Sequence, residues 1–379
     1  MSKRIFVSLG TRPEAIKLAP VIKALRNRPE EFDVFVCSSG QHREMLDQTL
    51  AAFNLVPDAN LSVMRDNQTL PELTAALVTQ VSKKIKEVEP DWVIVQGDTS
   101  TAFASALSAY YQRVPVAHVE AGLRSYDRYN PFPEEANRQM IGALAELHFA
   151  PTQRAVDALL KEGITHQNVF LTGNTVVDSL SDLKLRLETN EGLQLVSAPV
   201  RETAAGAERI VLITCHRRES FGEGLSAICR AIERIARKHP DVSFLFPVHL
   251  NPNVRSQVMP MLGSLPNVRL MEPLGYIDFI FLLARSVLAL SDSGGIQEEA
   301  PSFNVPVLIL RSTTERQEGI DAGVAELVGT DEELIVRRAD QLLTALPGKL
   351  QNNPYGDGAS GNRIADILSR DRLAPHGTR

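Results

Sequence analysis

The chain has 379 residues, 44% hydrophobic and 23% charged, and this length exceeds what one hydrophobic core usually supports, so we expect two domains. Its formal net charge of -6 gives no electrostatic support to nucleic-acid binding, and no apolar run approaches the roughly 20 residues of a membrane span. The three cysteines form no disulfide framework and fit a reducing compartment, so we expect a soluble, cytoplasmic protein with neither nucleic acid nor membrane as a partner.

In the first half of the chain, short apolar runs alternate with segments of helical periodicity. Helices are predicted over residues 14–26 and 70–88. The predicted strands are 5–10, 32–39, 92–98, 114–120, 147–151 and 169–173. This alternation indicates a parallel sheet with crossover helices.

The same alternation restarts after a polar stretch at 187–208, which we interpret as a linker region because it offers few core residues. The second set of predicted strands is 209–215, 242–248, 268–272, 287–292 and 305–310, and a final helix is predicted at 361–373. We therefore expect an α/β protein with two Rossmann-like, doubly wound domains facing a cleft. We place the first domain at 1–174 and the second at 175–360.

The run from His118 to Arg138 carries the strongest chemical signal. Glu120 ends an apolar strand, where open α/β sheets bind ligands, and Glu134 and Glu135 open the next predicted helix. Two carboxylates brought together across a loop can take up and return protons on one substrate. Glutamates also favour a helix N-terminus without any catalytic role, and for Glu135 that explanation is equally good. Glu120 has no helix of its own to cap, which favours function.

An anion site is predicted after the first strand. Residues 10–17 read GTRPEAIK, so Arg12 and Lys17 lie beside the free backbone donors of a helix start. A capped turn with solvated basic side chains is the alternative. The sequence contains neither the P-loop pattern nor GxGxxG, so ATP hydrolysis and NAD binding lack their fingerprints.

The second half carries a candidate nucleotide site. Ser293, Gly294 and Gly295 follow a predicted strand and would let backbone N–H groups approach a pyrophosphate. Glu299 follows in the same predicted helix and could accept hydrogen bonds from a ribose diol. Phe279 could stack on a base, although a lone phenylalanine is more often a core residue.

Two further strand ends matter. Asp98 either contributes to the site or simply caps the next helix. His216, in the basic run 214–222, could contact a diphosphate or protonate it as it leaves. No Cys/His spacing indicates a metal site, so none is expected.

Taken together, the motifs resemble the non-hydrolysing UDP-N-acetylglucosamine 2-epimerases of bacteria. The resemblance is collinear over nearly the whole chain and rests on GTRPEAIK, GQHREML, QGDTST, HVEAGLRS, PFPEEANR, TGNTVVD, CHRRESFG, PVHLNPNV, SDSGGIQEEAPS and NPYGDG. It implies a glycosyltransferase-B type fold whose last helix, within 361–379, packs back on the N-terminal domain. It also implies a homodimer and no added cofactor.

The resemblance implies an activity and a set of site residues. The activity is reversible C2 epimerisation of UDP-GlcNAc to UDP-ManNAc by elimination and re-addition of UDP through 2-acetamidoglucal, which supplies a ManNAc nucleotide for surface polysaccharide. The implied catalytic group is Asp98, Glu120, Glu134 and His216. The implied UDP contacts are Arg12, Lys17, Phe279, Ser293, Gly294, Gly295, Glu299 and Arg316. Some members bind a second, activating UDP-GlcNAc through residues that correspond to Gln41, Glu135, Arg217 and His249.

Other activities remain alternatives. An epimerase of a related UDP-diacetamido sugar or uronate, or a hydrolysing relative, would share the fold. A glycosyltransferase of the same fold would not explain the pairing of HVEAGLRS with PFPEEANR. A non-catalytic nucleotide-binding regulator is the remaining alternative.

Overall fold

The computed structural model describes residues 2–40, 43–65, 67–217, 221–345, 348 and 352–370, and only the backbone of residues 43–45, 47 and 48. The chain forms two compact units: unit 1 is Met1–Ser179 with Tyr355–Arg379, and unit 2 is Leu180–Pro354. Helix α7 (Thr175–Leu187) begins in unit 1 and ends in unit 2. The boundary therefore falls inside a continuous helix rather than at 174/175, and the return falls at 354/355 rather than at 360/361.

Unit 1 is built on a seven-stranded parallel sheet with the order β3-β2-β1-β4-β5-β6-β7. Its strands are β1 Lys3–Leu9, β2 Phe32–Ser38, β3 Ala59–Asn60, β4 Trp92–Gln96, β5 Val116–Val119, β6 Leu147–Ala150 and β7 Val169–Leu171. Its other helices are α1 Arg12–Arg26, α2 Arg43–Ala52, α3 Leu70–Val88, α4 Ser100–Tyr111, α5 Glu134–Leu144, α6 Gln153–Lys161, the 3-10 turn η1 His166–Asn168 and α16 Ser360–Arg370.

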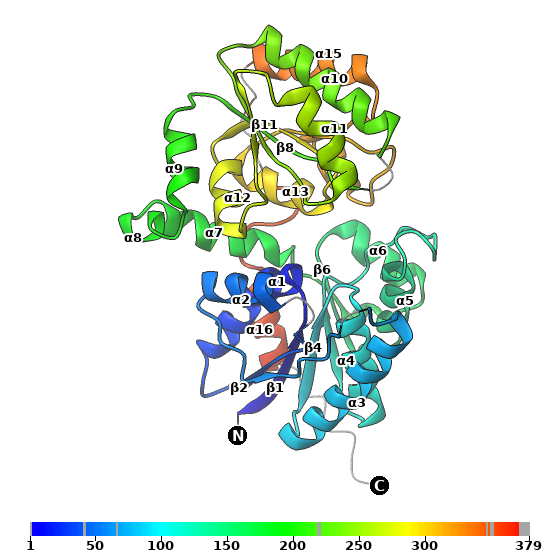
Figure 1. Cartoon of the computed structure of the whole chain (residues 1–379). Coiled ribbons are helices and arrows are strands. Elements are labelled where there is room, and N and C mark those ends of the chain that lie inside the picture. Colours follow the sequence, from blue (N-terminus) through cyan, green and yellow to red (C-terminus); the bar gives the residue numbers. More distant parts are fainter. Residues whose placement is uncertain are drawn as a thin grey trace. The chain divides into compact units, whose positions relative to one another are not determined.

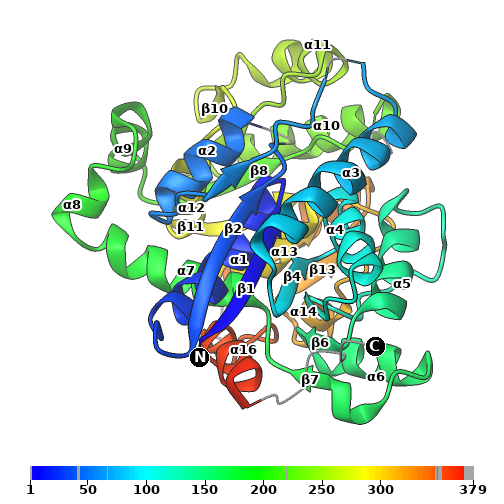
Figure 2. The ribbon, with the colours of Figure 1, turned by 90° about the horizontal axis from the view of Figure 1, so that it is seen from below.

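Alternation along the strands gives this sheet two buried faces. Ile5, Val7 and Leu9 of β1 pack into one core with α1 and α16. Phe6 faces the opposite core, which α3, α4 and α5 cover. Figure 1 shows α16, in red, against α1, and Figure 2 shows α3, α4 and α5 together. The last described helix thus belongs to unit 1 although 175 residues of unit 2, Leu180–Pro354, precede its segment.

Unit 2 is built on a six-stranded parallel sheet with the order β10-β9-β8-β11-β12-β13. Its strands are β8 Ile210–Thr214, β9 Ser243–Pro247, β10 Val268–Met271, β11 Ser286–Ser291, β12 Val307–Ile309 and β13 Ala325–Leu327. Its helices are α8 Asn190–Leu193, α9 Ala198–Ala205, α10 Glu223–Lys238, α11 Pro252–Leu262, α12 Tyr276–Leu283, α13 Gly294–Glu299, the 3-10 turn η3 Ala300–Phe303, α14 Gln317–Asp321 and α15 Glu332–Thr344.

Both sheets have a topological switch point in the middle. In each unit the first strand of the chain lies between the second and the fourth, so β1 pairs with β4 and β8 pairs with β11. The core on one face of the unit 2 sheet is formed with α10, α11 and α15. The predicted fold class of two doubly wound parallel α/β domains is confirmed. Such sheets bind ligands beyond the carboxyl ends of the strands at the switch point.

The predicted linker at 187–208 is wrong, because helices α8 and α9 form there and Val200 and Ala204 are buried. Alanine and glutamate favour a helix even where the pattern of core residues is weak. The short edge strands β3 and β13 were not predicted, since two or three residues carry too little periodicity. Within the described part of the chain, no helix combines the length and the apolarity needed to cross a bilayer.

Candidate active site

The sheet of unit 1 brings three chemically distinctive strand ends together. β1 pairs with β4 through Val7 and Ile94, and β4 pairs with β5 through Gln96 and Val119. Arg12, Asp98 and Glu120 follow these three strands almost directly. The predicted candidates therefore gather at the carboxyl edge of one sheet around its switch point.

Glu120 forms an ion pair with Lys17, whose Nζ donates to Glu120 Oε2. The two side chains are only 9% and 10% exposed, so water screens this pair weakly. A Cβ built on Gly97 would lie 3.8 Å from Glu120 Oε1, which places the carboxylate beside the turn after β4. Glu120 also has a φ of 62°, a left-handed conformation that is uncommon outside glycine and is often found at functional sites. Lys17 thus lies beside a candidate catalytic group; its role as a UDP contact stays a prediction.

Asp98 is held by two residues of α5. Arg138 Nε donates to Asp98 Oδ2 at 2.7 Å, and Asn137 Nδ2 donates to the Asp98 carbonyl oxygen at 2.8 Å. The alternative role of Asp98 as the cap of α4 is wrong, because Thr99 is the N-cap and accepts from the Ala102 N–H. The Asp98 carboxylate is therefore bound from the side of α5, and Thr99 caps α4 in its place.

Glu134 and Glu135 are neighbours in sequence with different surroundings. The Glu135 side chain is completely buried and accepts hydrogen bonds from the N–H groups of Ser125 and Tyr126 at 2.9 and 3.3 Å. Glu134 has a buried Oε2 that accepts no hydrogen bond from any described residue. A buried carboxylate oxygen without a donor is costly and calls for a partner that binds there.

Glu14 is a buried carboxylate that the sequence interpretation missed. It accepts hydrogen bonds from the N–H groups of Gly10 and Thr11 at 3.0 and 2.7 Å and from the Thr99 hydroxyl at 2.8 Å. Burial raises its pKa to about 7, although these hydrogen bonds act to lower it. Glu14 therefore ties the turn after β1, which carries Arg12, to the turn after β4. The sequence feature that could have revealed Glu14 is the capping-box spacing Thr-x-x-Glu, which starts at Thr11.

In unit 2 a histidine and an aspartate meet at the second switch point. His216 follows β8, Asp292 follows β11, and His216 Nδ1 lies 3.0 Å from Asp292 Oδ1. Asp292 Oδ2 also accepts from the backbone N–H groups of His216 and Arg217. Burial acts to raise the pKa of Asp292, but His216 and these N–H groups lower it below its ordinary value. The carboxylate orients the imidazole so that its Nε2 points away from Asp292.

The predicted nucleotide contacts of unit 2 lie in and around a short helix. Ser293 is the N-cap of α13, Gly294 and Gly295 begin it, and Glu299 ends it. Gly294 packs directly under Arg316, because a Cβ there would lie 2.7 Å from Arg316 Nη1.

Arg316 is itself held by carboxylates. Its Nε donates to Glu298 Oε1 at 2.7 Å, and its Nη1 forms an ion pair with Glu315. Burial acts to raise the pKa of Glu315, but Arg316 and Arg311 lower it to about 2, so this carboxylate stays ionised at neutral pH. The guanidinium is therefore fixed in direction before any ligand binds.

The remaining predicted residues are more exposed. Arg12 is partly exposed, and its guanidinium pairs with no other described residue. Phe279 is half-buried on α12. His249 is exposed and its ring stacks on that of His216 at 5.8 Å, while Gln41 lies outside the described residues. The allosteric role of Gln41, Glu135, Arg217 and His249 stays a prediction.

The arrangement suits acid–base chemistry in unit 1 and anion binding in unit 2. Across the described residues, His, Cys, Asp and Glu side chains form no group of three or more that could hold a metal ion.

Besides Glu14, sequence reasoning missed Arg138 and Asp292. Arg138 lies in the motif PFPEEANR and Asp292 in SDSGG, but their partners Asp98 and His216 lie far away along the chain.

Comparison with known proteins agrees with these motifs. A family model described as UDP-N-acetylglucosamine 2-epimerase matches residues 23–369. A "Probable UDP-N-acetylglucosamine 2-epimerase" from Ralstonia nicotianae is 50% identical over 97% of this chain and 98% of its own length. The UDP-N-acetylglucosamine 2-epimerase of Escherichia coli K12 is 45% identical over 98% of this chain and 100% of its own length.

The fold leads to the same group of proteins. The crystal structure of UDP-GlcNAc 2-epimerase from Neisseria meningitidis bound to UDP-GlcNAc superposes with a TM-score of 0.90 at 42% identity, covering 97% of this chain and 100% of that chain. By sequence and by structure, this chain belongs to the UDP-N-acetylglucosamine 2-epimerase family.

Proposed function

We propose that the protein catalyses the reversible C2 epimerisation of UDP-GlcNAc to UDP-ManNAc by eliminating and re-adding UDP. The relatives and the liganded neighbour carry names that specify a UDP-GlcNAc 2-epimerase, which supports the substrate and the reacting carbon. The chemistry of the substrate and of the site supports the product and the route.

The substrate decides the type of reaction. The C2 hydrogen of an N-acetylhexosamine is not α to a carbonyl group, so simple removal and return of this proton is not feasible. In the proposed route a base takes the C2 proton, a C1=C2 double bond forms, and the C1–O bond breaks with its electron pair leaving on UDP. A proton is then delivered to the opposite face of C2, and a UDP oxygen attacks C1. Each turnover therefore needs proton transfer on both faces of C2 and a stabilised diphosphate.

The observation that carries this proposal is the contrast between Glu120 and Glu134. Glu120 is ion-paired with Lys17, whereas the buried Oε2 of Glu134 accepts no hydrogen bond from any described residue. Two carboxylates in such different surroundings suit the two halves of an acid–base pair. We propose that Glu120, Glu134 and Asp98 carry the proton transfers between them.

Unit 2 would supply the groups that hold the departing UDP. His216, oriented by Asp292, offers a ring nitrogen to the diphosphate, and Arg316 offers a fixed guanidinium. Charge-assisted hydrogen bonds of this kind strengthen as negative charge develops on a leaving group. We propose the same role for Arg12 in unit 1.

Incubation of the protein with UDP-GlcNAc in D₂O, followed by proton NMR, tests the proposal. Deuterium should appear at C2 of both UDP-GlcNAc and UDP-ManNAc, and an ¹⁸O label in the bridging C1–O position should scramble into non-bridging positions. Glu120→Gln and Glu134→Gln should each lose on the order of 10²-fold in rate. Glu72→Gln, on the exposed start of α3, is the matched control and should keep full activity. Epimerisation without exchange at C2, or a fully active Glu120→Gln, would overturn the mechanism.

A further inference from the structure

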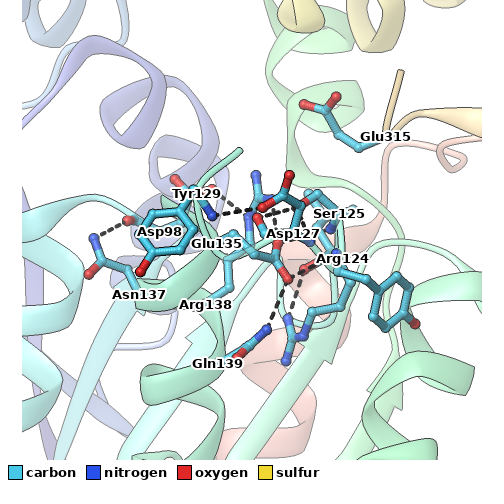
Figure 3. Close-up of polar contacts among 12 residues, drawn as sticks. Asp98, Arg124, Ser125, Asp127, Tyr129, Glu135, Asn137, Arg138, Gln139 and Glu315 are labelled. Atoms are coloured by element: carbon cyan, nitrogen blue, oxygen red, sulfur yellow. Dashed lines mark hydrogen bonds and ion pairs between the residues drawn. The ribbon is translucent and has the colours of Figure 1, made fainter. Parts of the chain in front are cut away.

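Among the residues that the structure describes, Arg138 is the one that binds the Asp98 side chain. Arg138 Nε donates to Asp98 Oδ2 at 2.7 Å, and the Asp98 backbone is held separately by Asn137 (Figure 3). Both partners come from the first turns of α5, whose first residue is Glu134. Helix α5 therefore carries Glu134 and also holds Asp98, although Asp98 itself lies in the turn after β4.

Arg138 is itself anchored on the other side. Its Nη1 lies 3.2 Å from Glu135 Oε2, and its side chain is only 6% exposed. Glu135, completely buried, binds the N–H groups of Ser125 and Tyr126, so the chain of contacts ends on backbone rather than on mobile side chains. Figure 3 shows this path from Asp98 through Arg138 to the loop.

The shape of the guanidinium matters for this path. A planar guanidinium presents Nε and Nη1 in fixed directions, so one side chain can bind two carboxylates that belong to different elements. An ammonium group is a single point donor and cannot hold both acceptors in the same orientation. Because Arg138 binds both carboxylates through fixed donor directions, it sets the direction of the Asp98 carboxylate. A contact that only balanced the charge of Asp98 would not need these fixed directions.

We propose that Arg138 is the positioning residue of the reaction: it fixes the Asp98 carboxylate relative to Glu134, with Glu135 holding Arg138 in place. This inference rests on the proposed function, because it requires Asp98 to act on the bound sugar. Arg138 does its work through Asp98. Removing it should therefore impair the chemical step and leave nucleotide binding unchanged.

Arg138→Lys and Arg138→Met should both lower kcat, by about 10²-fold, because a displacement of about 1 Å at a reacting group costs that much. The KM for UDP-GlcNAc and the Kd for UDP should change little. The matched control is Arg124→Lys. Arg124 has a side chain only 1% exposed and pairs with Glu162 through two contacts of 2.7 Å, and it contacts none of the candidate catalytic residues that the structure describes. This control should keep the wild-type kcat.

The decisive measurement combines Arg138→Met with Asp98→Asn. If Arg138 acts through Asp98, the double variant should have the kcat of Asp98→Asn alone, because residues that act as one unit are not additive. Fully additive losses would show that Arg138 supports the fold or another group, and would overturn the inference. If Arg138→Met does not fold, Arg138→Lys replaces it in the same comparison, with the melting temperature as the check on folding.

The result also separates this inference from the proposed function. A wild-type protein that exchanges no deuterium at C2, or an Asp98→Asn variant with full activity, would contradict the proposed function. A slow Asp98→Asn beside a fully active Arg138→Lys would contradict only the role of Arg138.

Discussion

Replacing Glu14 by glutamine should remove a pH-dependent loss of stability from unit 1. The carboxyl of Glu14 has an ordinary pKa of 4.5 and a folded-state pKa of about 7, so the folded chain holds this proton more tightly than the unfolded chain does. The contribution of Glu14 to the free energy of unfolding is fully present below pH 4.5 and is lost as the pH rises through 7. Each pH unit between the two values is worth about 1.4 kcal/mol, so ionising Glu14 in the folded state costs about 3 kcal/mol.

Glutamine fits the same hydrogen bonds. Its carbonyl oxygen can accept from the N–H groups of Gly10 and Thr11, as Glu14 Oε2 does, and its amide can donate to the Thr99 hydroxyl. The variant therefore keeps the contacts of the turn and loses only the ionisable group. At pH 8 it should be more stable, relative to the wild type, than it is at pH 5.

Urea unfolding between pH 5 and pH 8 measures this difference, with the fluorescence of Trp92 as the probe. Trp92 is the single tryptophan of the chain, and it is 2% exposed in the unit 1 sheet, so it reports on this unit. Glu72→Gln is the matched control, because Glu72 makes the same capping box at α3 but is exposed, and its hydrogen bonds with Thr69 lower its pKa. The control should differ from the wild type by a constant amount above pH 5. A constant difference for Glu14→Gln as well would refute the reasoning.

Four further predictions follow from the site and the family. Arg12→Ala should raise the KM for UDP-GlcNAc about 10- to 100-fold, since a charge-assisted contact is worth roughly 1.5–3 kcal/mol, with an unchanged melting temperature; unchanged kinetics would remove Arg12 from the site. Asp292→Asn should lower kcat by releasing the His216 ring, and a fully active variant would show that His216 needs no orienting carboxylate. Burial lowers the pKa of His118 from 6.5 to about 3, so its contribution to stability is lost as the pH falls from 6.5 towards 3, and His118→Asn should show a shallower acid loss in urea unfolding. Light scattering at micromolar concentration should give about twice the 41.7 kDa chain mass, and a clean monomer would contradict the expected homodimer.

Local sequence was enough to predict eleven of the thirteen described strands, whereas only three of the described α-helices were predicted by residue range. Ile5, Val7 and Leu9 alternate with residues for the opposite face, which specifies a buried strand whatever its neighbours are. The helix predicted at 70–88 is α3, whose start is marked by Thr69 and Glu72 in a capping box. Strand ends were predicted too late by one or two residues, at Asp98 and Glu120 for example, because the polar residue that follows a strand belongs to the loop.

The roles of individual residues depended on contacts that no local pattern encodes. Glu134 and Glu135 have the same chemistry and adjacent positions, but neighbouring residues on a helix point about 100° apart. Glu135 therefore binds a loop, whereas Glu134 Oε2 accepts no hydrogen bond within the described part of the chain. The sequence alone placed Asp98 and Glu120 at strand ends, because the end of a strand is a local feature. Only the tertiary structure decided which basic group each one meets: Lys17 for Glu120, across 103 positions, and Arg138 for Asp98, across 40. The order of the strands in the sheet decides which strand ends become neighbours in space. That order depends on how all the strands and helices pack together, so no local stretch of sequence encodes it.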